Sequence, residues 1–223
     1  MKKTIYLLNI GQYAPELTAL TYPHIGYYAN KIGAETYVID TRKFPEWDVS
    51  YEKLQIYELA QQRGDEWAIY IDSDALVHPE LPDVTELLPM DTVAHNGADF
   101  APIRWKYDKY FRRDGRNIGS CNWFTVASFW CFDLWKPLDI GPEEAVSNIN
   151  LTVPERSFMK PSHLVDDYAL SRNIARYGLK FKTLQQLWQE GNILNADFFF
   201  HQYTIELEEK ISRVRATIER WKI

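Results

Sequence analysis

The chain opens with a run of apolar residues that has the length of a strand. Thr4–Leu8 carries no alternating polar position, which is typical of a strand buried on both faces of a sheet. A second short buried strand is predicted at Thr36–Ile39, and it ends at Asp40. A helix over Pro23–Ile32, ended by Gly33, connects the two. The order strand, helix, strand favours a parallel sheet.

A longer helix and a strongly apolar strand follow. Ser50 is a favourable helix N-cap, and apolar positions recur from residue 54 to residue 60. Gly64 suits the left-handed conformation that ends many helices. The run Glu66–Ile71 then predicts a buried strand, which leads directly into Asp72 and Asp74.

The second half of the chain has a looser pattern. Prolines at 79, 82, 89 and 102 predict loops and short turns, and Phe124–Trp135 predicts one or two buried strands. Pro142–Pro161 is interpreted as a long loop, the kind that often serves as a lid or binding loop. A helix capped by Ser162 is predicted to end at Gly178. The chain closes with a strand at Phe198–Phe200 and an amphipathic helix, whose acidic start and basic end suit the helix dipole.

Polar residues follow three of the predicted strands, namely Asn9, Asp40 and Asp72. In open parallel sheets, ligands bind at the carboxyl ends of the strands, so we expect the binding site at the edge of the sheet where these three strands end. Asp72 and Asp74 are hard oxygen ligands that suit Mg²⁺ or Mn²⁺, and such a cation could bridge a diphosphate. The alternative is that the two carboxylates only cap a turn or the next helix. Their position at the end of a buried strand favours the metal site.

Composition narrows the classes of function. With 223 residues, the chain can form one substantial core, so a single domain is expected. The net charge of −6 argues against a nucleic-acid binder, because nonspecific binding to phosphates needs clustered Lys and Arg. The first apolar run has strand length, so no export signal is expected, and no stretch approaches the ~20 apolar residues of a transmembrane helix. Cys121 and Cys131 are expected to be buried free thiols, which is consistent with the cytoplasm.

The run Glu66–Ala75 resembles the DxD region of GT-A-fold glycosyltransferases. The similarity is greatest to the galactosyl- and xylosyltransferases of plant and fungal cell-wall synthesis, and looser to the glycogenin-like group. It extends across most of the chain. The resemblance implies a single α/β domain of GT-A type, with a Rossmann-like, mostly parallel central sheet flanked by helices. Residues 1–76 would form the nucleotide-binding half, and residues 77–223 the acceptor and catalytic half.

The same resemblance implies a metal-dependent hexosyl- or pentosyltransferase that uses Mn²⁺ or Mg²⁺. The donor would be a nucleotide sugar, expected to be a UDP-sugar, and the acceptor a glycan. Asn9 and Ile10 would lie at the nucleotide base, and Lys53 would approach the phosphates. Ser73 lies inside the DxD triplet, and His201 would join Asp72 and Asp74 as a metal ligand. The acidic pair Asp166–Asp167 would lie near the reacting sugar.

Each of these residues also has a simpler interpretation. His201 follows three phenylalanines and could be a packed core side chain, and Lys53 could be an exposed helix residue. Asp166 and Asp167 could be favourable charges near a helix N-terminus. From the residues alone, Asp40 could accept hydrogen bonds from a base or ribose or cap a turn, and Arg42 beside it could contact the nucleotide.

The chain departs from the family pattern at two points. Val126–Ser128 occupies the place where glycogenin-like enzymes have a small turn that contains Asn, so their sugar recognition does not transfer. The pair Asp166–Asp167 leaves the stereochemical class open, and the resemblance as a whole favours retention. The run Arg104–Arg113 interleaves positive charge with aromatic residues, which can stack on sugars, bind anions or touch a membrane surface. It could equally be an amphipathic surface segment.

Two other functional classes remain open. A strand that ends in DxD is also typical of haloacid-dehalogenase-type phosphatases, which place the nucleophile on the first strand, whereas two predicted strands precede Asp72 here. A catalytically inactive nucleotide-sugar-binding module would keep the fold and lose turnover. A nucleotide-sugar pyrophosphorylase is disfavoured, because no Gly-rich phosphate loop follows the first strand.

Overall fold

A mixed six-stranded sheet forms the centre of the molecule. The computed structural model describes residues 1–96, 123–151, 153, 155–157, 159–193, 197–202 and 205–222. The strand order is β2-β1-β3-β6-β5-β7, and β6 runs antiparallel to both of its neighbours while the other pairs are parallel. The mostly parallel α/β sheet expected from the sequence is confirmed. The strands are β1 (Lys3–Leu8), β2 (Ala34–Ile39), β3 (Trp67–Ile71), β5 (Thr92–His95), β6 (Phe124–Ser128) and β7 (Lys180–Thr183).

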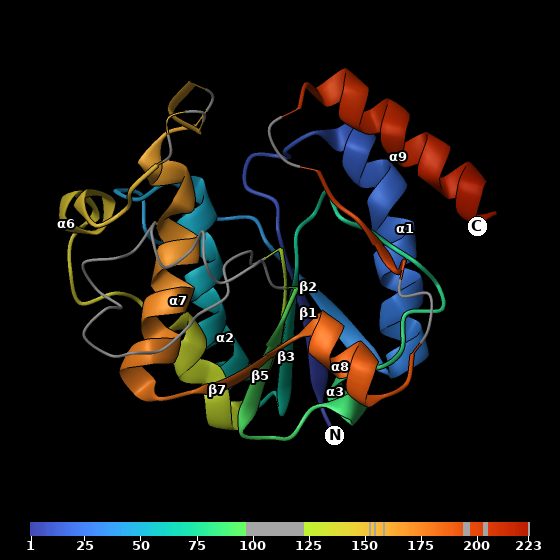
Figure 1. Ribbon diagram of the computed structural model, residues 1–223, viewed down its shortest axis with the longest axis horizontal. Coiled ribbons are helices and arrows are strands. Elements are labelled where there is room, and N and C mark those ends of the chain that lie inside the picture. Colours follow the sequence, from blue (N-terminus) through green and yellow to red (C-terminus); the bar gives the residue numbers. More distant parts are fainter. Residues whose placement is uncertain are drawn as a thin grey trace.

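Helices cover both faces of the sheet (Figure 1). One face carries α2 (Ile56–Arg63), α7 (Val165–Tyr177) and the 3₁₀ helices η1 (Val49–Gln55) and η2 (Phe129–Trp135). The other carries α1 (Pro15–Ile32) and α8 (Leu184–Glu190), and α9 (Leu207–Trp221) lies alongside α1. The short elements are β4 (Leu76–Val77), α3 (Val84–Leu87), α6 (Pro142–Ser147), η3 (Glu155–Ser157), η4 (Pro161–Leu164) and β8 (Phe199–Phe200).

The central strands are buried on both faces, as their continuous apolar sequences predicted. Ile5 and Ile69 belong to the core on the α1 side, whereas Tyr6 and Tyr70 belong to the core on the α2 and α7 side. All four side chains are almost fully buried. Burying one such isoleucine contributes about 1.5–3 kcal/mol, so the two layers fix the position of the strand ends that carry the polar residues.

The predicted helix ends at Gly33, Gly64 and Gly178 are confirmed. All three glycines have a left-handed backbone, with φ of 67°, 67° and 65°. A side chain at these positions would strain the backbone, because residues with a Cβ rarely adopt positive φ.

The predicted start of the first helix is wrong. α1 begins at Pro15 rather than at Pro23, which lies inside the helix. Proline is favoured in the first turn of a helix, where its missing N–H costs nothing, so from the sequence either proline could mark the start. The sequence pattern could not show that α1 accepts the loss of one hydrogen bond at Pro23, because packing of its buried face against the sheet stabilises the whole helix.

The predictions around β2 and the second helix also need correction. β2 is an edge strand, and Ile39 is its one buried residue, so the expectation of a short buried strand is wrong here. The region after Ser50 begins as a 3₁₀ helix capped by the side chain of Asp48, which accepts a hydrogen bond from the Ser50 backbone N–H. Ser50 is therefore the second residue of the element and not its cap.

Four predictions in the second half are wrong in detail. The loop region after Pro79 contains α3 and β5, and β5 was missed because four residues give too short a pattern. The run Phe124–Trp135 is one strand followed by the 3₁₀ helix η2. Pro142–Pro161 contains the helix α6, which Pro142 begins. Ser162 lies inside η4, and no side chain caps the start of α7.

Three further expectations concern membrane contact and cysteines. Within the residues that the structure describes, no helix is both long and apolar enough to cross a bilayer. Cys131 is a buried free thiol, as expected, and burial raises its pKa to about 11. Cys121 and the basic aromatic run Arg104–Arg113 lie outside the described residues.

The loop after β2 is held by one buried carboxylate. Glu52 is fully buried and accepts hydrogen bonds from the backbone N–H groups of Lys43 and Phe44 and from the Gln55 side chain. It also accepts from Arg42 Nε at 2.6 Å. The Arg42 guanidinium donates further to three carbonyl oxygens, those of Phe44, Pro45 and Trp47. The conformation of this loop therefore depends on the Glu52 charge.

We expect Glu52→Gln to lower the free energy of unfolding by about 2–3 kcal/mol, because hydrogen bonds to a buried charge are lost and Arg42 loses its ion pair. Urea denaturation followed by circular dichroism would measure the change. Glu58→Gln is the matched control, since Glu58 is an exposed carboxylate that pairs with Lys43. A change in the Glu52 variant no larger than in the control would contradict this role.

Candidate active site

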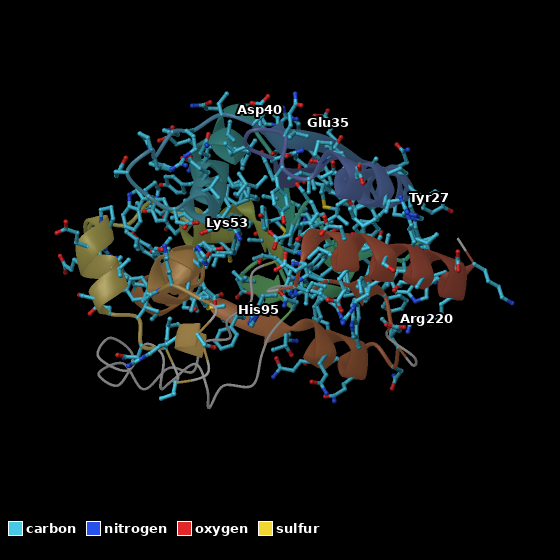
Figure 2. All side chains as sticks on the ribbon, turned by 90° about the horizontal axis from the view of Figure 1, so that it is seen from above. Tyr27, Glu35, Asp40, Lys53, His95 and Arg220 are labelled. Atoms are coloured by element: carbon cyan, nitrogen blue, oxygen red, sulfur yellow. The ribbon has the colours of Figure 1, made fainter. Side chains whose placement is uncertain are left out.

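Three neighbouring parallel strands end in polar residues at the same edge of the sheet. Asn9, Asp40 and Asp72 follow β1, β2 and β3, which are adjacent in the sheet. Figure 2, viewed from above, shows Lys53 and His95 towards the middle of the molecule, whereas Asp40 lies at the rim. The structure thus gathers the predicted polar residues at the edge where α/β proteins bind ligands.

Asp72, Asp74 and His201 form a compact cluster of potential metal ligands. One ligand atom from each residue lies within 4.8 Å of the others. His201 Nε2 is 3.5 Å from Asp72 Oδ2 and 3.4 Å from Asp74 Oδ1. Pairing of β4 with β8 explains this proximity, because β4 follows the two aspartates and β8 immediately precedes His201.

The residues of this cluster fit a divalent cation. Two carboxylates and one imidazole supply oxygen and nitrogen donors, a set that suits Mn²⁺ and also Mg²⁺. Each donor is oriented by a neighbour, as is usual in metal sites. The Tyr70 hydroxyl donates to Asp72, Lys210 Nζ lies 2.6 Å from Asp74 Oδ2, and the Trp123 indole stacks on the His201 ring with centroids 5.1 Å apart.

The charges of the cluster are strongly coupled. Burial disfavours the charged form of Asp72, but the Lys53 ammonium and the hydrogen bonds from His201 and Tyr70 outweigh it and lower the Asp72 pKa. For His201, burial favours the neutral ring, yet hydrogen bonds to the two aspartates raise its pKa to about 9. The ligand-free cluster is therefore a network of ion pairs.

A buried lysine connects this cluster to the predicted acidic pair. Lys53 Nζ lies 2.6 Å from Asp166 Oδ2 and 3.8 Å from Asp72 Oδ1. Asp166 and Asp167 are buried in the first turn of α7. Burial alone would lower the Lys53 pKa, but the carboxylates around it raise that pKa above its usual value. Lys53 also lies 4.5 Å from the centroid of the Tyr70 ring.

Asn9, which is predicted to lie at the nucleotide base, is connected by hydrogen bonds to Ser73 of the DxD triplet. Asn9 Nδ2 donates to the Tyr22 hydroxyl at 2.9 Å, and that hydroxyl donates to Ser73 Oγ at 3.2 Å. Ser73 Oγ in turn donates to the Leu8 carbonyl at 2.6 Å. Ile10 is partly buried against the core. Asn9 and Ser73 are thus connected through one tyrosine.

Asp40 and Arg42 differ from the other predicted residues. Both are exposed, and the Arg42 guanidinium is engaged by Glu52 and by the carbonyl oxygens of its own loop. The structure therefore shows Arg42 in a supporting position beneath the loop after β2. A direct contact of Arg42 with a nucleotide stays a prediction.

Tyr70, Lys210 and Trp123, which contact the cluster of Asp72, Asp74 and His201, were not predicted from the sequence. Tyr70 could have been inferred, because it lies two residues before Asp72 and so on the same face of the strand. Lys210 carried a weaker signal, as a cation within the buried stripe of the final amphipathic helix. The stacking of Trp123 on His201 had no local signal, because the two residues are far apart in sequence.

A second polar group lies further along the same edge. His95, at the end of β5, and Thr125, at the start of β6, face each other across the two strands. Both are buried, and neither the two ring nitrogens of His95 nor Thr125 Oγ1 has a hydrogen-bond partner among the described residues. A buried polar group without a partner costs about 1–3 kcal/mol. Burial accordingly lowers the His95 pKa to about 4.

Comparisons with known proteins bear on the fold. No family model and no curated protein sequence matches the chain. Among solved structures, the chain is similar to the crystal structure of a glycosyltransferase involved in the glycosylation of the major capsid of PBCV-1, with a TM-score of 0.55 and 12% identity. The match covers 97% of this chain and 100% of that chain. The similarity confirms a glycosyltransferase type of fold, while the galactosyl- and xylosyltransferase group stays a prediction.

The buried His95 predicts a specific pH dependence of stability. Below pH 6.5 the unfolded chain binds a proton at this residue, whereas the folded protein binds it only near pH 4. Stability is therefore lost as the pH falls from 6.5 to about 4, by about 3 kcal/mol if His95 alone is considered. We expect His95→Phe to flatten the dependence of the urea midpoint on pH over this range.

Thr125→Val is the control for this measurement. It changes the same buried group without removing a titrating side chain, so its pH curve should run parallel to that of the wild type. Parallel curves for His95→Phe and the wild type would show that His95 is not held neutral in the folded protein.

Proposed function

We propose that the protein is a metal-dependent glycosyltransferase, which transfers a sugar from a nucleotide sugar to a carbohydrate acceptor. The observation that carries the proposal is the connection of two carboxylate groups through Lys53. Asp72, with Asp74 and His201, offers a cation site at the sheet edge, and Asp166 lies on the other side of the same ammonium. The similarity in fold to a glycosyltransferase supports this interpretation.

In this proposal the nucleotide lies over the ends of β1 and β2. The expected nucleotide is UDP. Asn9 and Ile10 would contact its base, and Asp40 would accept hydrogen bonds from its ribose. Arg42 would act by holding the loop after β2 through Glu52. The Asn9–Tyr22–Ser73 connection would keep the base side and the diphosphate side of the donor in a fixed relation.

The diphosphate would lie at Asp72, Asp74 and His201. A Mn²⁺ or Mg²⁺ ion bound there would supply Lewis-acid stabilisation of the negative charge that develops on the leaving group. Lys53 and Lys210 are buried cations beside the two aspartates, and they would add electrostatic stabilisation of the same charge. Ser73 would hold the turn between the two carboxylates through its hydrogen bond to Leu8.

Asp166 and Asp167 would act at the reacting sugar. One of them would deprotonate the acceptor hydroxyl in an inverting reaction, or stabilise an oxocarbenium-like centre in a retaining one. The family resemblance favours retention. The proposed halves, residues 1–76 for the donor and 77–223 for acceptor binding and catalysis, would overlap at the cation site, because His201 and Lys210 come from the second half.

The first test is ligand-dependent stability. The panel consists of UDP-, GDP- and dTDP-sugars, each with and without Mn²⁺. We expect UDP-sugars to raise the unfolding temperature, and only when Mn²⁺ is present. A ligand at 100 times its Kd stabilises by about 2.7 kcal/mol. Asp74→Asn should abolish the shift, because it replaces a carboxylate ligand of the cation with a neutral amide of nearly the same size and shape. Asp139→Asn, which makes the same change at a half-exposed carboxylate paired with Arg172, should keep the shift.

Other results of this screen would support other functions. A shift without transfer or hydrolysis would indicate an inactive nucleotide-sugar-binding module. No shift with any nucleotide, together with hydrolysis of p-nitrophenyl phosphate, would contradict the proposal and favour the phosphatase.

The acidic pair predicts a separate effect on turnover. Asn substitution at the catalytic member of Asp166–Asp167 should lower kcat by about 100-fold or more, while the Kd for the donor changes little. Asp166→Asn should also lower the unfolding temperature, because buried Lys53 loses its closest partner. Steady-state kinetics with the donor found above would measure kcat, and NMR of the first product would give its anomeric configuration. Full activity in both variants would exclude this pair from catalysis.

A further inference from the structure

His95 and Thr125 lie on the face of the sheet that carries the proposed catalytic residues. Thr125 pairs with Tyr70 in the β3–β6 ladder and with His95 in the β5–β6 ladder. Directly opposed residues of antiparallel strands point to the same face. Tyr70 packs in the core shared with α7, and its hydroxyl binds Asp72. His95 and Thr125 therefore extend a row that begins beside the cation site.

The position of the pair matches the direction in which a donor would extend. Two strand spacings separate His95 from Tyr70 in this row, which is ~10 Å. The first turn of α7, with Asp166, lies over Tyr70 through their shared neighbour Lys53. The row of Tyr70, Thr125 and His95 thus extends from the proposed diphosphate position on the side of the sheet that carries the acidic pair.

The side chains of His95 and Thr125 can both form hydrogen bonds with hydroxyl groups. A neutral imidazole offers one donor and one acceptor, and a threonine hydroxyl offers both. A sugar hydroxyl has the same dual character. Because none of these atoms has a partner among the described residues, a sugar could bind them without breaking an existing hydrogen bond. The Phe181 ring packs beside His95, with centroids 5.7 Å apart, and offers an apolar contact.

We propose that His95 and Thr125 form a subsite that hydrogen-bonds the hydroxyl groups of a sugar ring. The inference rests on the proposed transferase function and names two specificity residues within it. The donor sugar and the acceptor sugar share this chemistry, and the experiment below distinguishes them. A sugar would supply the hydrogen bonds that these side chains do not make to the described residues, so the pair contributes to recognition of the sugar and not of the nucleotide.

The experiment compares His95→Phe and Thr125→Val with the wild type. Titration calorimetry with Mn²⁺ would give Kd values for UDP, UDP-glucose and UDP-galactose, and for GDP, GDP-mannose, dTDP and dTDP-glucose. We expect each variant to weaken binding of the preferred nucleotide sugar about tenfold while leaving its bare nucleoside diphosphate unchanged. Both variants should unfold at the same temperature as the wild type or higher at pH 7.5, because each removes a buried polar group that has no partner among the described residues.

Thr92→Val is the matched control, since Thr92 is a buried threonine at the opposite end of β5. It should leave the ratio of the two Kd values unchanged. Unchanged donor binding with a raised KM for the acceptor in both variants would also support the subsite and assign it to the acceptor sugar.

Three results would overturn the inference. Equal weakening of nucleotide and nucleotide sugar would show a structural role. Variants with unaltered Kd ratios and unaltered kinetics would exclude the pair from sugar recognition, while leaving the transferase proposal in place. Failure of the wild type to bind any nucleotide with Mn²⁺ would instead remove the proposed function, and this inference with it. If His95→Phe does not fold, the nearly isosteric Thr125→Val decides between these results.

Discussion

The organisation of this site depends on the buried ammonium of Lys53. It lies between Asp72 at the end of β3 and Asp166 at the start of α7, and so joins the sheet edge to the helix layer. Taking charges out of water is costly, and removing one partner of such a group leaves an uncompensated charge in the interior. The strand end and the helix start are therefore stable only together. In the proposed function the same contact would also fix the distance between the two acidic groups.

A second constraint comes from the C-terminal part of the chain, which supplies His201 and Lys210 to the site. The short β4–β8 pairing sets His201 beside the two aspartates, and the following helix α9 brings Lys210 to Asp74. Helix α9 lies alongside α1, where Ile211 and Val214 join Leu17 in a small core (Figure 1). Apolar packing of α9 thus places the Lys210 ammonium beside the Asp74 carboxylate.

Much of this arrangement could be predicted from the sequence, and the remainder could not, for identifiable reasons. The buried strands, the glycine helix ends and the edge formed by Asn9, Asp40 and Asp72 follow from local patterns, because burial and backbone geometry leave marks within a few residues. The strand β5 and the start of α1 were mispredicted, since a four-residue strand and an internal proline give ambiguous local signals. Contacts such as Trp123 with His201 and Lys210 with Asp74 are set by tertiary packing, which no local pattern encodes.

The charge balance of the site also bears on what it can bind. Lys53 and Lys210 lie beside Asp72 and Asp74, and His201, whose pKa is raised to about 9, would have to release its proton to bind a cation. A bare divalent cation would meet these positive groups at short range, and like charges in a buried site repel strongly. A cation that arrives with a diphosphate brings negative charge to which the two lysines can turn. In the proposed function, the two lysines would therefore favour joint binding of cation and diphosphate over binding of the cation alone.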